Sequence, residues 1–223
     1  MTKEWPWTAK IRAILEESLA MMRLGGRLAA ALIMAIDPAL AQGTRVTITF
    51  TPESKTPAFE AAAAEYRSIW GAEGARIIDS MERLTTLRFP QKKIDIQVFE
   101  GTSNASLLFN RAGVPVGSRD PMQLRASYSA DNKKGTLIHE LGHRMNLNLR
   151  TRPQDLDEHR LLFLYLYDLY VDLYGKEFAD AQVAFGRTLK GRYDYDTAWT
   201  WTLAMTREER ASRFAGVLKA KGK

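Results

Sequence analysis

Two kinds of hydrophobic pattern run through the chain from residue 45 onward. Residues 45–50, 93–100 and 122–129 alternate between apolar and polar side chains, which is typical of β-strands with one buried face. Residues 57–84 instead carry apolar side chains at helical spacing and begin with a proline, which suits a first helical turn. We therefore expect three strands, with a long helix between the first and the second. Gly71 and Gly74 would be weak points of that helix.

The second half of the chain has helical patterns. Residues 155–175 are apolar on nearly every helical face and end at a glycine, so we expect a buried helix there. Further helices are expected over residues 176–189, 196–204 and 206–219. Because strands come first and helices follow, the pattern indicates an α+β domain over residues 44–223 with a helical C-terminal third.

Polar side chains mark the starts of two helices. Asp131 is suited to cap the helix that follows the third strand. Thr206, followed three residues later by Glu209, forms a capping box before the last helix. Between the second and third strands, residues 101–121 are irregular and rich in Gly, Ser and Asn, which predicts a long surface loop of the kind that often has a function.

Residues 1–43 differ from the rest of the chain. Their apolar run, residues 28–36, is too short for a transmembrane helix, which needs about 20 residues. Read from Met21 or Met22, the segment has the form of a secretory signal peptide with cleavage near Ala41, which would make the protein secreted or periplasmic. The alternative is an amphipathic N-terminal extension of a cytoplasmic protein, because residues 9–22 have helical spacing.

The composition excludes several kinds of functional site. The chain of 223 residues has no cysteine, which excludes disulfides, thiolate metal sites and a cysteine nucleophile. Any metal ion must therefore be held by His, Asp or Glu. The net charge is +6, but the basic residues are scattered and form no recognition motif, so we expect no specific nucleic-acid partner. The oligomeric state is left open.

The segment GTLIHELGHRMN, residues 135–146, places His139 and His143 four residues apart. On a helix these positions share one face, so two imidazoles can bind one metal ion. Glu140 lies one step round the helix, where its carboxylate can reach a water on that metal without ligating it. Gly142 is costly inside a helix, and its expected use is to let another segment pass close to this turn.

A catalytic zinc usually has three protein ligands and one open position. His159 is the only other histidine of the chain and begins the next expected helix, so it is the first choice for the third ligand. Glu158 is the main rival, and Asp157 or Asp155 is a weaker one. Whichever residue is not a ligand can hold the outer N–H of a ligand imidazole. Asp168 or Asp172 could do the same from the apolar helix.

The pattern His-Glu-x-x-His, here HELGH, resembles the signature of the zincin metallopeptidases. The resemblance implies zinc ligands at His139 and His143, a general base at Glu140, and a small mixed sheet backed by helices. It also implies that residues 122–129 are an edge strand that binds extended substrate. The spacing of the third histidine is similar to that of SprT-like proteases, although their cysteines are absent, as are the metzincin extension and the second motif of thermolysin-like enzymes.

We therefore expect a zinc-dependent metallopeptidase, a hydrolase that cleaves peptide or protein substrates with a metal-activated water and Glu140 as the base. Residues 101–121 would line or cover the cleft. The alternative is a non-catalytic metal-binding domain of zincin fold that acts as a partner-binding or sensory module. The residue that stabilises the oxyanion is left open among five candidates: Arg125, Tyr128, Tyr165, Tyr167 and Tyr170.

Overall fold

The computed structural model describes residues 45–149, 152–190 and 193–220. The predictions for residues 1–43, a signal peptide or an amphipathic extension, lie outside these residues. Within the described part of the chain, no helix combines the length and the apolar character that crossing a membrane requires.

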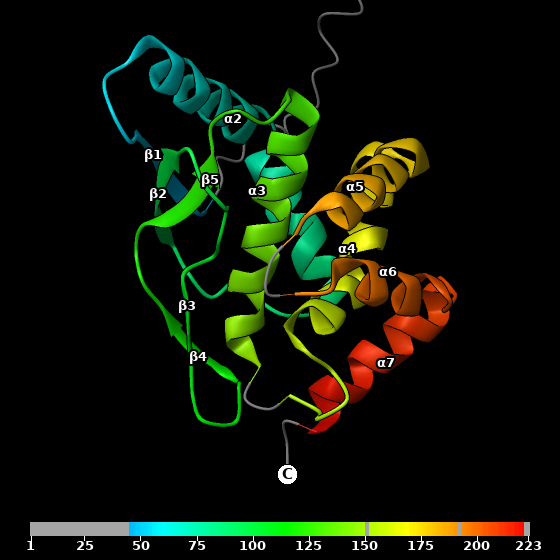
Figure 1. The fold of residues 1–223 in the computed structure, drawn as a ribbon. Helices are drawn as coiled ribbons and strands as arrows, with labels where there is room; N and C mark the ends of the chain where they lie inside the picture. Colours follow the sequence, from blue (N-terminus) through cyan, green and yellow to red (C-terminus); the bar gives the residue numbers. More distant parts are fainter. Residues whose placement is uncertain (1–44, 150–151, 191–192, 221–223) are drawn as a thin grey trace, which may run out of the picture. The chain divides into compact units, whose positions relative to one another are not determined.

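A three-stranded parallel sheet lies at one side of the described domain (Figure 1). Its strands, in spatial order, are β1 (Thr47–Pro52), β2 (Lys93–Phe99) and β5 (Met122–Arg125). Alternate residues of the middle strand β2 are fully buried, as its apolar and polar alternation predicts. All three predicted strands are confirmed. The third ends four residues early, because residues 126–129 form the turn that leads into the next helix.

Helix α2 (Pro57–Thr85) makes the parallel connection from β1 to β2. It starts with Pro57 in its first turn and ends at Thr86, whose φ of 57° lies in the left-handed region. Gly71 and Gly74 do not interrupt it. Gly74 lies against the ring of Trp70, where a Cβ atom would come within 2.7 Å, so this glycine serves packing inside the helix.

The second connection, from β2 to β5, contains no helix. Residues 101–121 instead hold an antiparallel ribbon of β3 (Leu107–Phe109) and β4 (Pro115–Ser118), which differs from the irregular loop that the sequence predicts. Figure 1 shows this ribbon extending away from the three-stranded sheet alongside helix α3.

The remaining described elements are helical and follow the predicted order. They are α3 (Ala130–Met145), the 3-10 turn η2 (Asn146–Asn148), α4 (Glu158–Tyr174), α5 (Lys176–Thr188), α6 (Tyr195–Leu203) and α7 (Arg207–Ala220). Helix α4 is the central one, because it packs against α2, α3, α5, α6 and α7. This explains why its sequence is apolar on nearly every face. The α+β class and the helical C-terminal third are confirmed.

One predicted helix cap is wrong and one is confirmed. Helix α3 is capped by Ser129, whose Oγ accepts a hydrogen bond from the Asn132 N–H at 3.3 Å, and Asp131 lies inside the first turn. At α7 the capping box is complete. The Thr206 N–H donates to Glu209 Oε2 at 2.7 Å, and the Glu209 N–H donates to Thr206 Oγ1 at 3.2 Å.

Candidate metal centre

The three histidines of the chain meet where α3 and α4 pack together. His139 and His143 lie one turn apart on α3, and His159 is in the first turn of α4. One ligand nitrogen from each lies within 4.8 Å of the others, and the Nε2 atoms of His139 and His143 are 3.0 Å apart. A tetrahedral zinc site places ligand nitrogens about 3.3 Å from one another. The three imidazoles are therefore close enough together to hold one metal ion.

A glycine brings the two helices into this contact. A Cβ atom on Gly142 would lie 2.5 Å from Cδ1 of Leu162 on α4. The Tyr165 hydroxyl also donates a hydrogen bond to the Gly142 carbonyl at 2.8 Å. Helix α4 thus passes directly against the turn that carries the histidines, which is the use predicted for Gly142.

Glu158 lies behind His143. Its Oε1 atom is 3.1 Å from Nδ1 of His143, on the opposite side of the imidazole ring from the Nε2 atom that faces His139. Its other oxygen, Oε2, accepts a hydrogen bond from the Tyr193 hydroxyl at 3.1 Å. Glu158 is thereby placed to hold the outer nitrogen of an imidazole whose inner nitrogen faces the cluster, an arrangement that fixes ring orientation at metal sites.

The two aspartates considered as ligands have other partners. Asp157 caps α4 by accepting a hydrogen bond from the Arg160 N–H at 2.7 Å. Asp155 forms an ion pair with Arg213 of α7. Of the alternatives weighed from the sequence, His159 is the one that the structure gathers with His139 and His143.

Burial favours the neutral, metal-binding form of two histidines. It lowers the pKa of His139 well below the usual value, and the neighbouring His143 and His159 lower it further. Burial, followed by the charge of His143, lowers the pKa of His159 to about 3. In His143, burial alone would lower the pKa, but the carboxylate of Glu158, 3.1 Å from Nδ1, outweighs burial and raises the pKa.

Buried nitrogen atoms supply a test of whether a metal fits here. Nδ1 of His159 is buried and has no hydrogen-bond partner among the described residues. A buried polar atom left without a partner costs free energy, and ligation of a metal ion by this nitrogen would relieve that cost. A three-histidine set with a carboxylate behind one ring suits a divalent transition metal, zinc included.

Glu140 is buried next to the histidines. Burial raises its pKa to about 7, although the positive charge of nearby His143 and the N–H of Ala105 act in the opposite direction. A carboxyl group with a pKa near neutrality exchanges protons efficiently at neutral pH. Glu140 thus has the chemistry of a general base or acid beside the cluster.

Two pockets of about 410 and 230 Å³ meet at the histidine cluster. Six residues line both of them: Ser103, Asn104, His139, Glu140, Tyr193 and Tyr195. The cluster is therefore open to a cleft on two sides, and the predicted role of residues 101–121 in lining that cleft is met by the part from Thr102 to Phe109. Tyr193 and Tyr195, which follow α5, were missed from the sequence.

The expectation that residues 122–129 form an edge strand is confirmed in part, because β5 is an outer strand of the three-stranded sheet. Gln123 of β5 exchanges two backbone hydrogen bonds with Asn104, at 2.9 and 3.0 Å. At this residue, the backbone groups on the outer edge of β5 are therefore already hydrogen-bonded to the segment around Asn104. Gln123 lines neither pocket, whereas Ser103 and Asn104 line both. Ser103 and Asn104 therefore border the cleft next to β5, whose Arg125 lines the larger pocket.

Arg144 anchors the segment around Asn104, a role that the sequence pattern does not predict. It follows His143 directly and is fully buried. Its guanidinium donates to Ala105 O (2.6 Å), Ser118 Oγ (2.5 Å), Arg119 O (2.8 Å), Gln91 Oε1 (3.2 Å) and Asp120 Oδ1 (3.3 Å). The rigid fork of an arginine can serve several acceptors at once. The connection from β2 to β5 is therefore tied to the residue next to a histidine of the cluster.

Replacing Arg144 with Met is expected to lower the free energy of unfolding by about 3–5 kcal/mol, because it leaves a set of buried acceptors without a donor. Arg144→Lys should lose less, since it keeps the charge but not the fork. Urea denaturation measures both. Arg111→Met, at an exposed turn of the ribbon, is the control and should change stability by less than about 0.5 kcal/mol. A loss below about 1 kcal/mol for Arg144→Met would contradict this role.

The remaining residues singled out from the sequence divide into two groups. Asp168 forms a buried bidentate pair with Arg210 of α7, and Asp172 pairs with Arg207, so neither aspartate contacts the cluster. Among the oxyanion candidates, three line the larger pocket, namely Arg125, Tyr128 and Tyr170. The hydroxyls of three tyrosines have structural partners: Tyr165 donates to Gly142 and Asn146, Tyr167 donates to Asp180, and Tyr170 donates to the Gly135 carbonyl at 2.8 Å.

No protein-family model, no curated protein and no solved structure matches this chain. What the site can do must therefore be argued from its own geometry.

Proposed function

We propose that the chain is a zinc-dependent metallopeptidase. One observation carries this proposal: three imidazoles from two helices converge within 4.8 Å at the meeting point of two pockets, with a buried carboxylate beside them. A structural zinc is usually closed off by a fourth protein ligand, whereas a catalytic one keeps a position open. Access from two pockets favours the catalytic alternative.

The residues have distinct roles in this proposal. His139, His143 and His159 are the ligands, and Glu158 holds His143 in place through its Nδ1 atom, 3.1 Å away. When bound, zinc supplies a Lewis acid that lowers the pKa of water to about 7 and polarises a carbonyl group. Glu140 takes the proton of the attacking water and passes it to the leaving amine.

Tyr195 is the best-placed group to donate a hydrogen bond to the oxyanion. It lines both pockets, and its ring centroid lies 4.6 Å from that of His159 and 6.3 Å from that of His139. Burial raises the pKa of its phenol, and the negative charge of Glu140 raises it further. The hydroxyl therefore keeps its proton. A donor aimed at developing negative charge contributes substantially to acyl-transfer catalysis.

Metal analysis and a peptide library test the proposal together. The purified full chain is expected to bind about one zinc ion per molecule and to cleave a mixture of unstructured peptides. Removal of the metal with a chelator should abolish cleavage, and added zinc should restore it. If the fully zinc-loaded protein cleaves no member of a diverse library, the peptidase proposal is wrong.

A further inference from the structure

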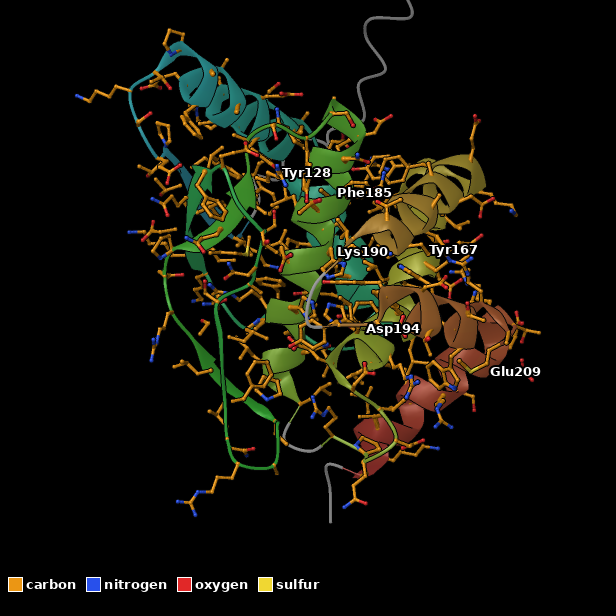
Figure 2. The ribbon with its side chains drawn as sticks, viewed as in Figure 1. Tyr128, Tyr167, Phe185, Lys190, Asp194 and Glu209 are labelled. Atoms are coloured by element: carbon orange, nitrogen blue, oxygen red, sulfur yellow. The ribbon has the colours of Figure 1, made fainter. Side chains whose placement is uncertain are left out.

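The larger pocket extends beyond the groups proposed to carry out catalysis. From His139 and Glu140 it continues along α3 to Gly135 and Thr136, one turn earlier on the same helix face. Its opposite wall comes from α5 and the residues that follow it. Figure 2 shows Phe185 and Lys190 on that side, with Tyr128 near the beginning of α3.

The walls of this extension are aromatic. Tyr128 and Phe185 make an edge-to-face contact with ring centroids 5.1 Å apart. Trp199 lines the pocket from α6 and is stacked on Phe163 at 3.7 Å, which holds its ring in place. Aromatic surfaces arranged in this way favour an aromatic occupant, through stacking and edge contacts.

The pocket also contains a polar side chain, Gln182 of α5. Gln182 is only 5% exposed, yet it lines the pocket. Its carboxamide lies against Gly135, where a Cβ atom would come within 1.9 Å of Oε1. Among the described residues its one hydrogen bond is from Nε2 to Asn132 Oδ1, at 3.5 Å. No hydrogen bond to the carboxamide oxygen is found among the described residues, so this oxygen is available to accept one from a ligand that brings a donor.

The charges that line the pocket disfavour a basic occupant. Of the described residues that line it, Glu140 is the one acidic residue, and this carboxylate has the proposed catalytic role. Lys190 is exposed at the pocket and has no ion-pair partner within the part of the chain that the structure describes. Arg125 also lines the pocket, and its charge is paired with Glu100 at 2.6 Å. A positively charged side chain in this pocket would be repelled by Lys190, and no free carboxylate would offset that repulsion.

We infer that this extension of the larger pocket is a subsite for a tyrosine side chain of the substrate, adjacent to the peptide bond that is cleaved. The phenol ring packs against Tyr128, Phe185 and Trp199, and its hydroxyl donates a hydrogen bond to the Gln182 carboxamide oxygen. A cavity of about 410 Å³ is within the range typical of small-ligand sites. This inference names the substrate preference of the proposed peptidase and rests on that proposal.

Peptides that differ only in the residue next to the cleaved bond test the subsite. The kcat/KM for Tyr is expected to exceed that for Phe about three- to tenfold, because one neutral hydrogen bond is gained. Both should exceed Ala and Lys by at least about tenfold. Gln182→Met should bring the Tyr-to-Phe ratio close to one. No aromatic preference, or an unchanged ratio in Gln182→Met, would overturn the inference.

A second variant fills the subsite. Thr136→Phe adds a ring in the space meant for the substrate, so the Tyr-to-Ala ratio of kcat/KM should fall at least about tenfold. Thr49→Phe, at an exposed position of β1, is the matched control and should leave that ratio unchanged. An equal loss for Tyr and Ala peptides in Thr136→Phe would show a general effect on the site and overturn the inference.

Binding separates failure of the subsite from failure of the proposed function. N-acetyl-tyrosinamide is added to the zinc-loaded protein and its binding is followed by saturation-transfer NMR, with N-acetyl-lysinamide as the comparison. Selective binding that Thr136→Phe abolishes supports the subsite, even if no peptide is cleaved and the peptidase proposal fails. Cleavage without aromatic selectivity, and without binding of the tyrosine derivative, overturns the subsite and leaves the peptidase proposal standing.

Discussion

Replacement of Glu140 by Gln is expected to lower the kcat of peptide cleavage about a thousandfold while zinc stays bound. The amide keeps the size of the carboxylate but cannot take a proton. Glu140 is buried beside the histidines and is not a member of the three-histidine group, so its loss should leave the metal in place. Steady-state kinetics and metal analysis of the same preparation measure both quantities.

The control for this variant is Glu60→Gln, at an exposed position in the first turn of α2, which should keep full activity. Two outcomes would contradict the role of Glu140. Retention of more than about a tenth of the activity would mean that another group acts as the base. Loss of zinc would mean that Glu140 is itself a ligand.

The second large effect is expected at the third ligand. His159→Ala should weaken zinc binding by more than the 10- to 100-fold that loss of an outer partner typically costs. Glu158→Gln should weaken it by about 10- to 100-fold, because the amide can still contact Nδ1 of His143 but no longer carries the charge. Competition with a chromogenic chelator of known affinity measures both constants.

The same pair of variants decides between the two residues left open by the sequence. If Glu158→Gln loses zinc and His159→Ala retains it, Glu158 is the ligand and the proposed roles are exchanged. Circular dichroism of the zinc-free variants serves as the control for folding, because His159 is buried and Glu158 is half-buried at the start of α4.

Local features of the fold were predictable because they depend on neighbouring residues. The alternation in β2 and the helical spacing of α2 follow from burial of one face of each element. The apolar sequence of α4 follows from its burial on nearly every face. The error at Asp131 is also local: Ser129 and Asp131 are both good capping residues, and the turn that ends at residue 129 selects between them. The β3–β4 ribbon has short strands and too few residues for a clear alternation.

Contacts between distant segments could not be predicted in the same way. The number of donors on Arg144 is a property of its side chain, but its acceptors come from residues 91 to 120 and are assembled only by folding. Tyr193 and Tyr195 carry no sequence signal that separates them from the other tyrosines of the chain. They become candidates because the chain after α5 returns to the histidines.

By itself the sequence determined that two imidazoles and a carboxylate share one region of a helix, since i and i+4 positions always do. The sequence also limited the candidates for the third metal ligand to a few residues at the start of the next helix. Only the tertiary structure decided that His159 joins the cluster while Glu158 lies behind His143. The physical reason is the close approach of α3 and α4 at Gly142, where the lack of a side chain lets Leu162 and Tyr165 pack against the turn that carries the histidines.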